Sequence, residues 1–168
     1  KAKVGMLSSE YFQLESDAVF DIGLTPNRSD AMGHIGVSRD LLTVLNHKGG
    51  KLQKLQMCRP SVEGFKVANT NKTITDEVKG TELCPRYSGV SICGIKITNS
   101  PDWLQNKLKA IGLTPINNIV DITNYVLHET GQPLHAFDIA KIKGNKVIVS
   151  TIKNKTKFLL LVRCSYFD

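Results

Sequence analysis

The chain has 168 residues, which is enough for one large or two small domains with a hydrophobic core. Apolar residues make up 41% and charged residues 22%, an ordinary balance that excludes a disordered tail, a collagen-like fibre and a low-complexity linker. The net charge of +7 favours a polyanionic partner such as RNA, but weakly, because many basic proteins bind no nucleic acid. The longest unbroken apolar run, Phe158 to Val162, is far too short to span a membrane.

The amino-terminal residues and the cysteines indicate the cellular context. No apolar signal core follows Lys1 to Gly5, and the first residue is not methionine, so we expect a piece of a longer protein without a secretory peptide. The cysteines form no C-x-x-C pair, and the histidines complete no metal-ligand pattern. We therefore expect no metal site, a cytoplasmic location, and free, buried thiols at Cys58, Cys84, Cys93 and Cys164.

A strand followed by a helix is predicted in the first quarter of the chain. Apolar side chains alternate from Ala18 to Leu24, which is typical of a strand with one apolar face. Residues 25–30 interrupt this pattern with a proline and good helix N-caps, and a helix is expected from about Ala31 to Lys48. Gly33 and Gly36 each cost such a helix about 1 kcal/mol relative to alanine. We expect them to allow the close approach of another backbone.

The predicted domain boundary divides the chain into residues 1–60 and 61–168, because a connecting stretch with a proline ends there. Beyond it, short strands are predicted at Phe65–Ala68 and Lys72–Thr75, and a longer strand at Tyr87–Ile97.

Two helices are predicted in the second half. Ser100 and Pro101 are typical of a helix start, and the helix that follows is expected to bury Trp103, Leu104, Leu108 and Ile111. The next helix is expected from Asn118 to about His128. Its polar stripe could face solvent or belong to a site, and it comprises Asp121, Asn124 and His128.

A turn at Gly144–Asn145 and a strand at Lys146–Ser150 complete the predicted elements. Together the elements indicate an α+β fold with two small lobes and a mixed sheet with packed helices. The same region carries a basic stretch without any acidic residue, which could be a solvated strand edge or a contact with a nucleic-acid backbone. Its lysines are Lys141, Lys143, Lys146, Lys153, Lys155 and Lys157.

Three stretches together resemble the beta chain of bacterial phenylalanyl-tRNA synthetases. They read FDIGLTPNRSDAMGHIGVSRDL at residues 20–41, CPRY at 84–87, and NIVDITNYVL followed by GQPLHAFD at 118–138. The resemblance covers about residues 5–158, and residues 159–168 depart from the family pattern.

The resemblance implies a domain organisation, partners and cofactors. Residues 1–60 correspond to the returning half of a small interrupted N-terminal domain, and residues 61–168 to the first part of the editing domain. The family enzyme is a ligase built from two alpha and two beta chains, whose alpha chain charges phenylalanine tRNA with the help of ATP and magnesium. In this segment itself we expect no cofactor.

The resemblance also implies an editing site, which hydrolyses tyrosine wrongly attached to phenylalanine tRNA. Thr123, Asn124 and His135 match positions that line this pocket in the family. Thr123 and Asn124 are expected to orient water or the terminal ribose. His135 is expected to hold the water or the ester and to act as a general base. The family's glutamate that recognises the tyrosine hydroxyl lies beyond residue 168, so the isolated segment is expected to be inactive.

Two other functions stay open at this point. A non-catalytic RNA-binding module would need the basic stretch on one exposed face and binding that weakens steeply with salt. A structural docking domain would leave the side chains of Thr123, Asn124 and His135 pointing apart or fully satisfied in the core. His135 in particular could be a hydrogen-bonded core histidine, because its neighbours in sequence are apolar.

Overall fold

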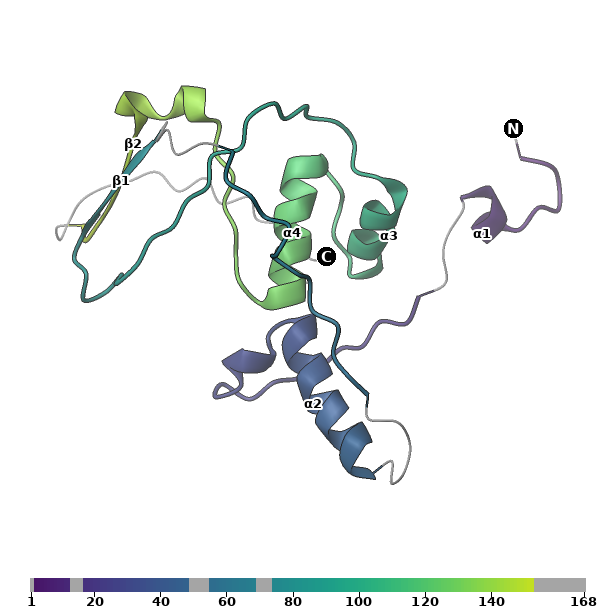
Figure 1. Ribbon diagram of the computed structural model, residues 1–168. Helices are drawn as coiled ribbons and strands as arrows, with labels where there is room; N and C mark the ends of the chain where they lie inside the picture. Colours follow the sequence, from purple (N-terminus) through teal and green to yellow (C-terminus); the bar gives the residue numbers. More distant parts are fainter. Residues whose placement is uncertain (1, 13–16, 49–54, 69–73, 153–168) are drawn as a thin grey trace. The chain divides into compact units, whose positions relative to one another are not determined.

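The computed structural model describes residues 2–12, 17–48, 55–68 and 74–152 (Figure 1). The chain divides into two compact units, one formed by Lys1–Val67 and Gly94–Ala136 and the other by Ala68–Cys93 and Phe137–Asp168. The predicted α+β class with two small lobes is confirmed. The domain boundary after residue 60 stays a prediction.

The first unit is helical. Within it α4 packs along α3, and its carboxyl-terminal end contacts α2 (Figure 1). Of the helices in the described part of the chain, none combines the length and apolar character that crossing a membrane requires. The elements of this unit are α1 (Ser8–Tyr11), the 3₁₀ turn η1 (Ser29–Ala31), α2 (His34–Lys48), α3 (Asp102–Ala110) and α4 (Asn118–Thr130).

The start of α2 confirms the predicted use of its glycines. A Cβ atom at Gly33 would lie 2.6 Å from the backbone nitrogen of Gly131, at the end of α4. A Cβ atom at Gly36 would overlap the carbonyl oxygen of Asp30 in η1. Both glycines therefore make room for backbone, which cannot swing aside as a flexible side chain can. The single helix predicted from Ala31 is in fact η1 followed by α2.

Helix α3 buries a narrower stripe than predicted. Leu104 and Leu108 are 2% and 1% exposed, which confirms two members of the stripe. Trp103 is 56% exposed, so its predicted burial is wrong, and its ring contacts Tyr125 of α4 edge-on with centroids 5.6 Å apart. Pro101 is the N-cap, and the hydroxyl of Ser100 does not cap the helix but donates a hydrogen bond to Asp121 of α4.

Helix α4 has well-defined ends. The side-chain oxygen of Asn117 caps the amino terminus by accepting hydrogen bonds from the backbone N–H groups of Ile119 and Val120, both at 3.0 Å. At the other end Gly131 adopts a φ of 76°, a left-handed conformation that favours glycine. The predicted helix is confirmed and runs two residues further, to Thr130.

The second unit contains a parallel pair of strands, β1 (Thr75–Lys79) and β2 (Lys146–Ser150), with Thr75 opposite Lys146. Strand β2 has the predicted bounds. Strand β1 begins at Thr75, the last residue of the strand predicted at Lys72–Thr75, of which residues 72 and 73 lie outside the described residues. The predicted turn at Gly144–Asn145 is confirmed, with φ angles of 67° and 50°. It lies within the 3₁₀ turn η3 (Lys143–Asn145), which follows η2 (Ile139–Lys141).

The strands predicted at residues 18–24, 65–68 and 87–97 are wrong, since the structure has no strand in these described segments. Their apolar side chains are largely exposed, with Phe20 at 81% and Val90 at 69%. Alternating side chains indicate which face of a possible strand is apolar. A strand forms, however, only where a neighbouring segment accepts and donates its backbone hydrogen bonds. The alternation in these segments carries no information about such a partner.

Candidate functional site

Thr123 and Asn124 both lie on α4 and are half-buried. The Thr123 hydroxyl donates a hydrogen bond to the carbonyl oxygen of Val120, at 2.7 Å. This bond fixes the direction of the hydroxyl against the helix backbone. A hydroxyl that donates in this way can still accept a hydrogen bond from water or from a ribose hydroxyl.

His135 follows α4 in the same compact unit, four residues after the left-handed Gly131. Its side chain is exposed, so the interpretation as a core histidine is wrong. The imidazole is therefore accessible to a substrate. That Thr123, Asn124 and His135 meet around one pocket stays a prediction from the resemblance.

Asp121 corrects the interpretation of the polar stripe as a solvent face. Its side chain is fully buried, at 0% exposure. One carboxylate oxygen accepts a hydrogen bond from the Ser100 hydroxyl at 2.5 Å, and the other accepts one from the backbone N–H of Ile116 at 2.9 Å. The sequence indicates only that an acidic residue is favourable where Asp121 stands, in the first turn of α4. Ser100 lies 21 residues earlier, and sequence spacing alone does not pair them.

The carboxyl-terminal end of α4 is held by α2. The Nδ1 atom of His34 lies 2.8 Å from the carbonyl oxygen of His128, and it acts as the donor because the carbonyl can only accept. His128 is half-buried, and burial lowers the pKa of its imidazole, with a smaller contribution in the same direction from the charge of His34. The neutral form of His128 is therefore the one that the fold favours.

Acidification is expected to weaken the fold through His128. Because its pKa is lowered in the folded state, the unfolded chain binds the proton more readily, and stability falls as the pH drops below the ordinary value of 6.5. We expect the wild-type chain to lose stability relative to His128→Gln between about pH 7 and about pH 5. Urea unfolding of both proteins across this range measures the difference. An identical pH dependence in the two proteins would contradict the assignment.

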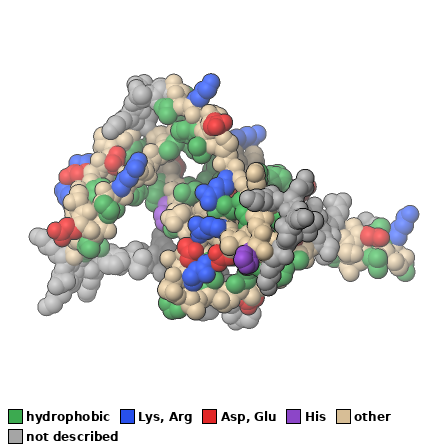
Figure 2. All heavy atoms as spheres, turned by 60° about the horizontal axis from the view of Figure 1, so that its bottom comes forward, with side chains coloured by type: hydrophobic (Ala, Val, Ile, Leu, Met, Phe, Trp, Pro, Cys, Tyr) green, Lys and Arg blue, Asp and Glu red, His purple; other side chains and the backbone are tan. Residues whose placement is uncertain are grey.

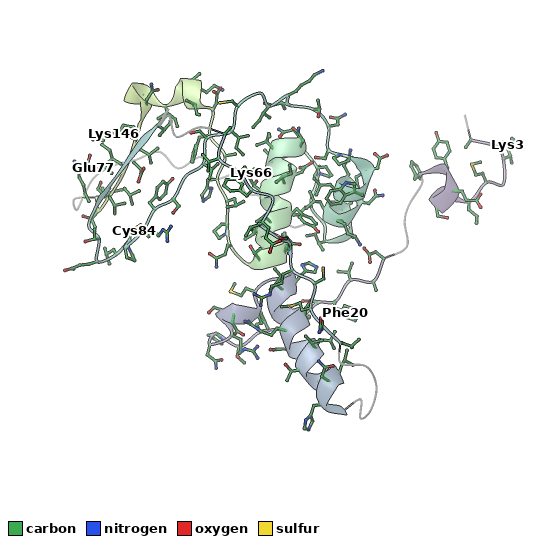
Figure 3. The ribbon with its side chains drawn as sticks, viewed as in Figure 1. Lys3, Phe20, Lys66, Glu77, Cys84 and Lys146 are labelled. Atoms are coloured by element: carbon green, nitrogen blue, oxygen red, sulfur yellow. The ribbon has the colours of Figure 1, made fainter. Side chains whose placement is uncertain are left out.

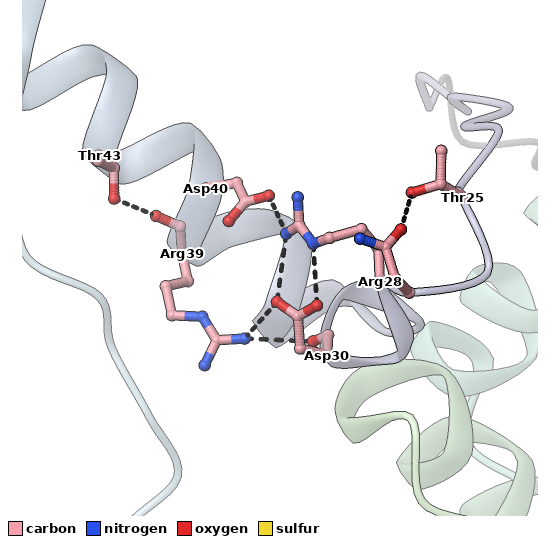
Figure 4. Close-up of polar contacts among 7 residues, drawn as sticks. Thr25, Arg28, Asp30, Arg39, Asp40 and Thr43 are labelled. Atoms are coloured by element: carbon pink, nitrogen blue, oxygen red, sulfur yellow. Dashed lines mark hydrogen bonds and ion pairs between the residues drawn. The ribbon is translucent and has the colours of Figure 1, made fainter.

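Residues 25–43 carry a self-neutralising charge network (Figure 4). The Arg28 guanidinium binds the Asp30 carboxylate through two hydrogen bonds of 2.9 and 3.2 Å and also contacts Asp40. Arg39 donates to the same Asp30 carboxylate at 3.2 Å. The hydrogen bond from Arg28 lowers the pKa of Asp30 and raises that of the guanidinium. Two cations and two anions therefore fix the turn before α2 and leave no net charge for a polyanion.

The described part of the basic stretch is also partly neutralised. Lys146 and Glu77 lie on neighbouring strands and form an ion pair of 2.5 Å (Figure 3). Lys141 lies 3.8 Å from Asp138. Figure 2 shows basic and acidic side chains interspersed on the face it displays. These observations favour the strand-edge interpretation, whereas three lysines of the stretch, Lys153, Lys155 and Lys157, lie outside the described residues.

The described cysteines are free, as predicted, but their predicted burial is wrong. Cys58 and Cys93 are exposed and Cys84 is half-buried, while Cys164 lies outside the described residues. Within the described ranges, no group of three or more histidine, cysteine, aspartate and glutamate side chains is arranged to hold a metal ion.

Comparison with known proteins identifies the family. The model of the B3/4 domain matches residues 83–166, which is half of the chain. The chain is 51% identical over 161 residues to the phenylalanine–tRNA ligase beta subunit of Bacteroides thetaiotaomicron, covering 96% of the chain and 19% of that protein. It is 48% identical to the same subunit of Porphyromonas gingivalis, covering 95% and 19%, and 46% identical to that of Dehalococcoides mccartyi, covering 88% and 17%.

The chain thus spans about a fifth of the length of the curated relatives it matches. The resemblance to the beta chain of bacterial phenylalanyl-tRNA synthetases is confirmed by these matches. On the strength of the domain match, the chain belongs to the B3/4 domain family.

Proposed function

We propose that this chain is part of the beta subunit of a phenylalanine–tRNA ligase and supplies one wall of its editing site. There, tyrosine wrongly attached to phenylalanine tRNA is removed by hydrolysis. The observation that carries the proposal is the 51% identity to a beta subunit along 96% of the chain. The B3/4 match and the accessible His135 next to the helix with Thr123 and Asn124 support it.

The need for editing follows from the chemistry of the two amino acids. Tyrosine differs from phenylalanine by one hydroxyl group, and a hydrophobic pocket cannot strongly reject an analogue that only adds a hydroxyl. A second, hydrolytic site can recognise the added hydroxyl through a hydrogen bond. Such a site needs no covalent nucleophile when a water molecule is well positioned against the ester.

The proposed roles follow from the groups that this chain offers. Water attacks the ester carbonyl carbon, the ester C–O bond breaks, and the ribose oxygen leaves with a proton. His135 takes a proton from the attacking water as a general base and returns it to the ribose oxygen as the C–O bond breaks, so that the protons balance. The Thr123 hydroxyl accepts hydrogen bonds, and the Asn124 amide accepts and donates them, and these bonds orient the water or the terminal ribose.

The remaining partners belong to the parent enzyme. We propose that it is cytoplasmic and that the beta subunit assembles with an alpha chain, which carries the aminoacylation site with its ATP and magnesium. We expect the present segment to hold neither ATP nor magnesium. Its ligand is the 3′ end of phenylalanine tRNA.

Deacylation of tyrosyl-tRNA by the full-length parent enzyme tests the proposal. His135→Ala is expected to slow deacylation about 100- to 10,000-fold, the usual contribution of general acid–base catalysis. Thr123→Ala and Asn124→Ala are expected to slow it less, and phenylalanine aminoacylation is expected to stay unchanged. His47→Ala, which changes another exposed histidine, is the matched control.

Two results would contradict the proposal. The first is wild-type deacylation in the His135→Ala and Asn124→Ala enzymes. The second is an enzyme without deacylation whose binding of tRNA by this segment falls steeply with salt, which would favour the RNA-binding module instead. The isolated 168-residue chain is expected to catalyse neither aminoacylation nor efficient deacylation.

A further inference from the structure

We propose that Asp121 is a positioning residue for the editing reaction. Its buried carboxylate fixes the rotation of α4 about its own axis and thereby the directions of Asn124 and Thr123. This inference rests on the proposed function, and it assigns to Asp121 no contact with the substrate.

The carboxylate joins three parts of the first unit. Asp121 itself lies in the first turn of α4 and is fully buried. Ser100, which is 5% exposed and directly precedes the N-cap of α3, donates its hydroxyl to one carboxylate oxygen. Ile116, which precedes the N-cap of α4, donates its backbone N–H to the other oxygen. One side chain therefore ties α4 to the start of α3 and to the loop that directly precedes α4.

Ser100 and the start of α4 are themselves held in place. The Gln105 side chain of α3 donates to the carbonyl oxygen of Ser100 at 2.7 Å. The Asn118 side chain donates to the carbonyl oxygen of Lys96 at 3.0 Å and accepts from the N–H of Thr98 at 3.2 Å. Ser100 and the first residue of α4 are consequently part of a hydrogen-bond network around the carboxylate rather than mobile surface groups.

Burying the carboxylate of Asp121 is energetically unfavourable compared with burying an apolar side chain. Removing its charge from water is unfavourable, and an apolar side chain of similar volume would pack between α3 and α4 at lower cost. Apolar contacts such as those of Leu104 and Leu108 are not directional, so they tolerate rotation and sliding of one helix against another. The hydrogen bond from Ser100 is directional and favours one orientation of α4 relative to the start of α3, while the bond from Ile116 holds the carboxylate in place at the start of α4. The carboxylate therefore provides a defined orientation of α4.

The orientation matters because of helix geometry. Successive residues of an α-helix are separated by about 100° around its axis, so Asn124 lies about 60° from Asp121, one turn along the same side. A small rotation of α4 therefore moves Asn124 and Thr123 together. Displacing a reacting or orienting group by about 1 Å can slow a reaction about 100-fold.

The experiment uses the full-length parent enzyme and separates kcat from KM for deacylation of tyrosyl-tRNA. Asp121→Ala is expected to lower kcat about 10- to 100-fold, with KM and the rate of phenylalanine aminoacylation unchanged. Asp121→Asn is expected to recover most of kcat, because the amide can accept from Ile116 and donate to the Ser100 hydroxyl. Asp102→Ala, which removes an exposed acid from the first turn of α3, is the matched control.

Ser100→Ala tests the same connection from the other side. It is expected to lower the deacylation kcat by severalfold, and the Ser100→Ala/Asp121→Ala double variant is expected to be no slower than Asp121→Ala alone, because both changes break one interaction. If Asp121→Ala does not fold, Ser100→Ala and Asp121→Asn decide the matter, and an unchanged kcat in Ser100→Ala then overturns the proposal.

Several results would overturn the proposal. Wild-type kcat in folded Asp121→Ala would show that Asp121 positions nothing. A raised KM with unchanged kcat would make Asp121 a binding residue, and equal losses of deacylation and aminoacylation in both Asp121 variants would make it a purely structural one. A parent enzyme that deacylates no tyrosyl-tRNA would overturn the proposed function as well, whereas one that deacylates normally despite Asp121→Ala overturns only the positioning role.

Discussion

Replacing Gly36 by alanine is expected to destabilise the chain by about 1–3 kcal/mol, the usual cost of forcing an extra methyl group into a packed site. Helix propensity alone predicts the opposite, since alanine is about 1 kcal/mol more favourable than glycine inside a helix. The packing around Gly36 decides whether alanine stabilises or destabilises the chain. A Cβ atom at Gly36 would overlap the Asp30 carbonyl oxygen and lie 2.7 Å from the Ala31 Cα, and both are backbone atoms.

Urea unfolding of the wild-type and Gly36→Ala chains measures this effect. Gly64→Ala is the matched control, because nothing lies within 4 Å of the Cβ atom it would add. There, alanine is expected to be neutral or to stabilise by up to about 1 kcal/mol through the unfolded state. A Gly36→Ala chain as stable as Gly64→Ala would mean that η1 does not pack on α2 in solution.

The same two glycines show how far the sequence alone could predict the fold. Gly33 and Gly36 are unfavourable within a predicted helix, and this local cost was sufficient to predict a close backbone approach. The partner backbones, the end of α4 for Gly33 and η1 for Gly36, could not be predicted. The wrong strands at residues 18–24 and 87–97 fail for the same reason. Local pattern specifies what a segment can form, and its partner in the fold depends on residues far along the chain.

The candidate site divides in a similar way. Thr123, Asn124 and His135 could be identified by resemblance, because they lie in contiguous strings of residues. Asp121 lies in the same string, and helical periodicity places it in a polar stripe that could face solvent. It is buried and accepts a hydrogen bond from Ser100, and helical periodicity carries no information about a hydroxyl 21 residues away. The residues that hold a site in place are therefore harder to predict than the residues that line it.

Replacing Gly33 by alanine is expected to separate α2 from the end of α4 and to destabilise the chain by about 1–3 kcal/mol. The added Cβ atom would lie 2.6 Å from the backbone nitrogen of Gly131 and 2.9 Å from the carbonyl carbon of Thr130. Neither atom can move without shifting the last turn of α4. Since His34 donates to the His128 carbonyl oxygen at the same contact, the shift is expected to weaken that hydrogen bond as well.

A double-mutant cycle tests whether one contact carries both effects. Gly33→Ala and His34→Ala are expected to cost less together than the sum of their separate costs, because the first change already disrupts what the second removes. Gly64→Ala combined with His34→Ala is the additive control, since the two positions share no contact. Urea unfolding gives all the free energies required. Strictly additive free-energy changes for Gly33→Ala and His34→Ala would show that the glycine and the histidine act independently. The end of α4 would then be held by two separate contacts rather than by one.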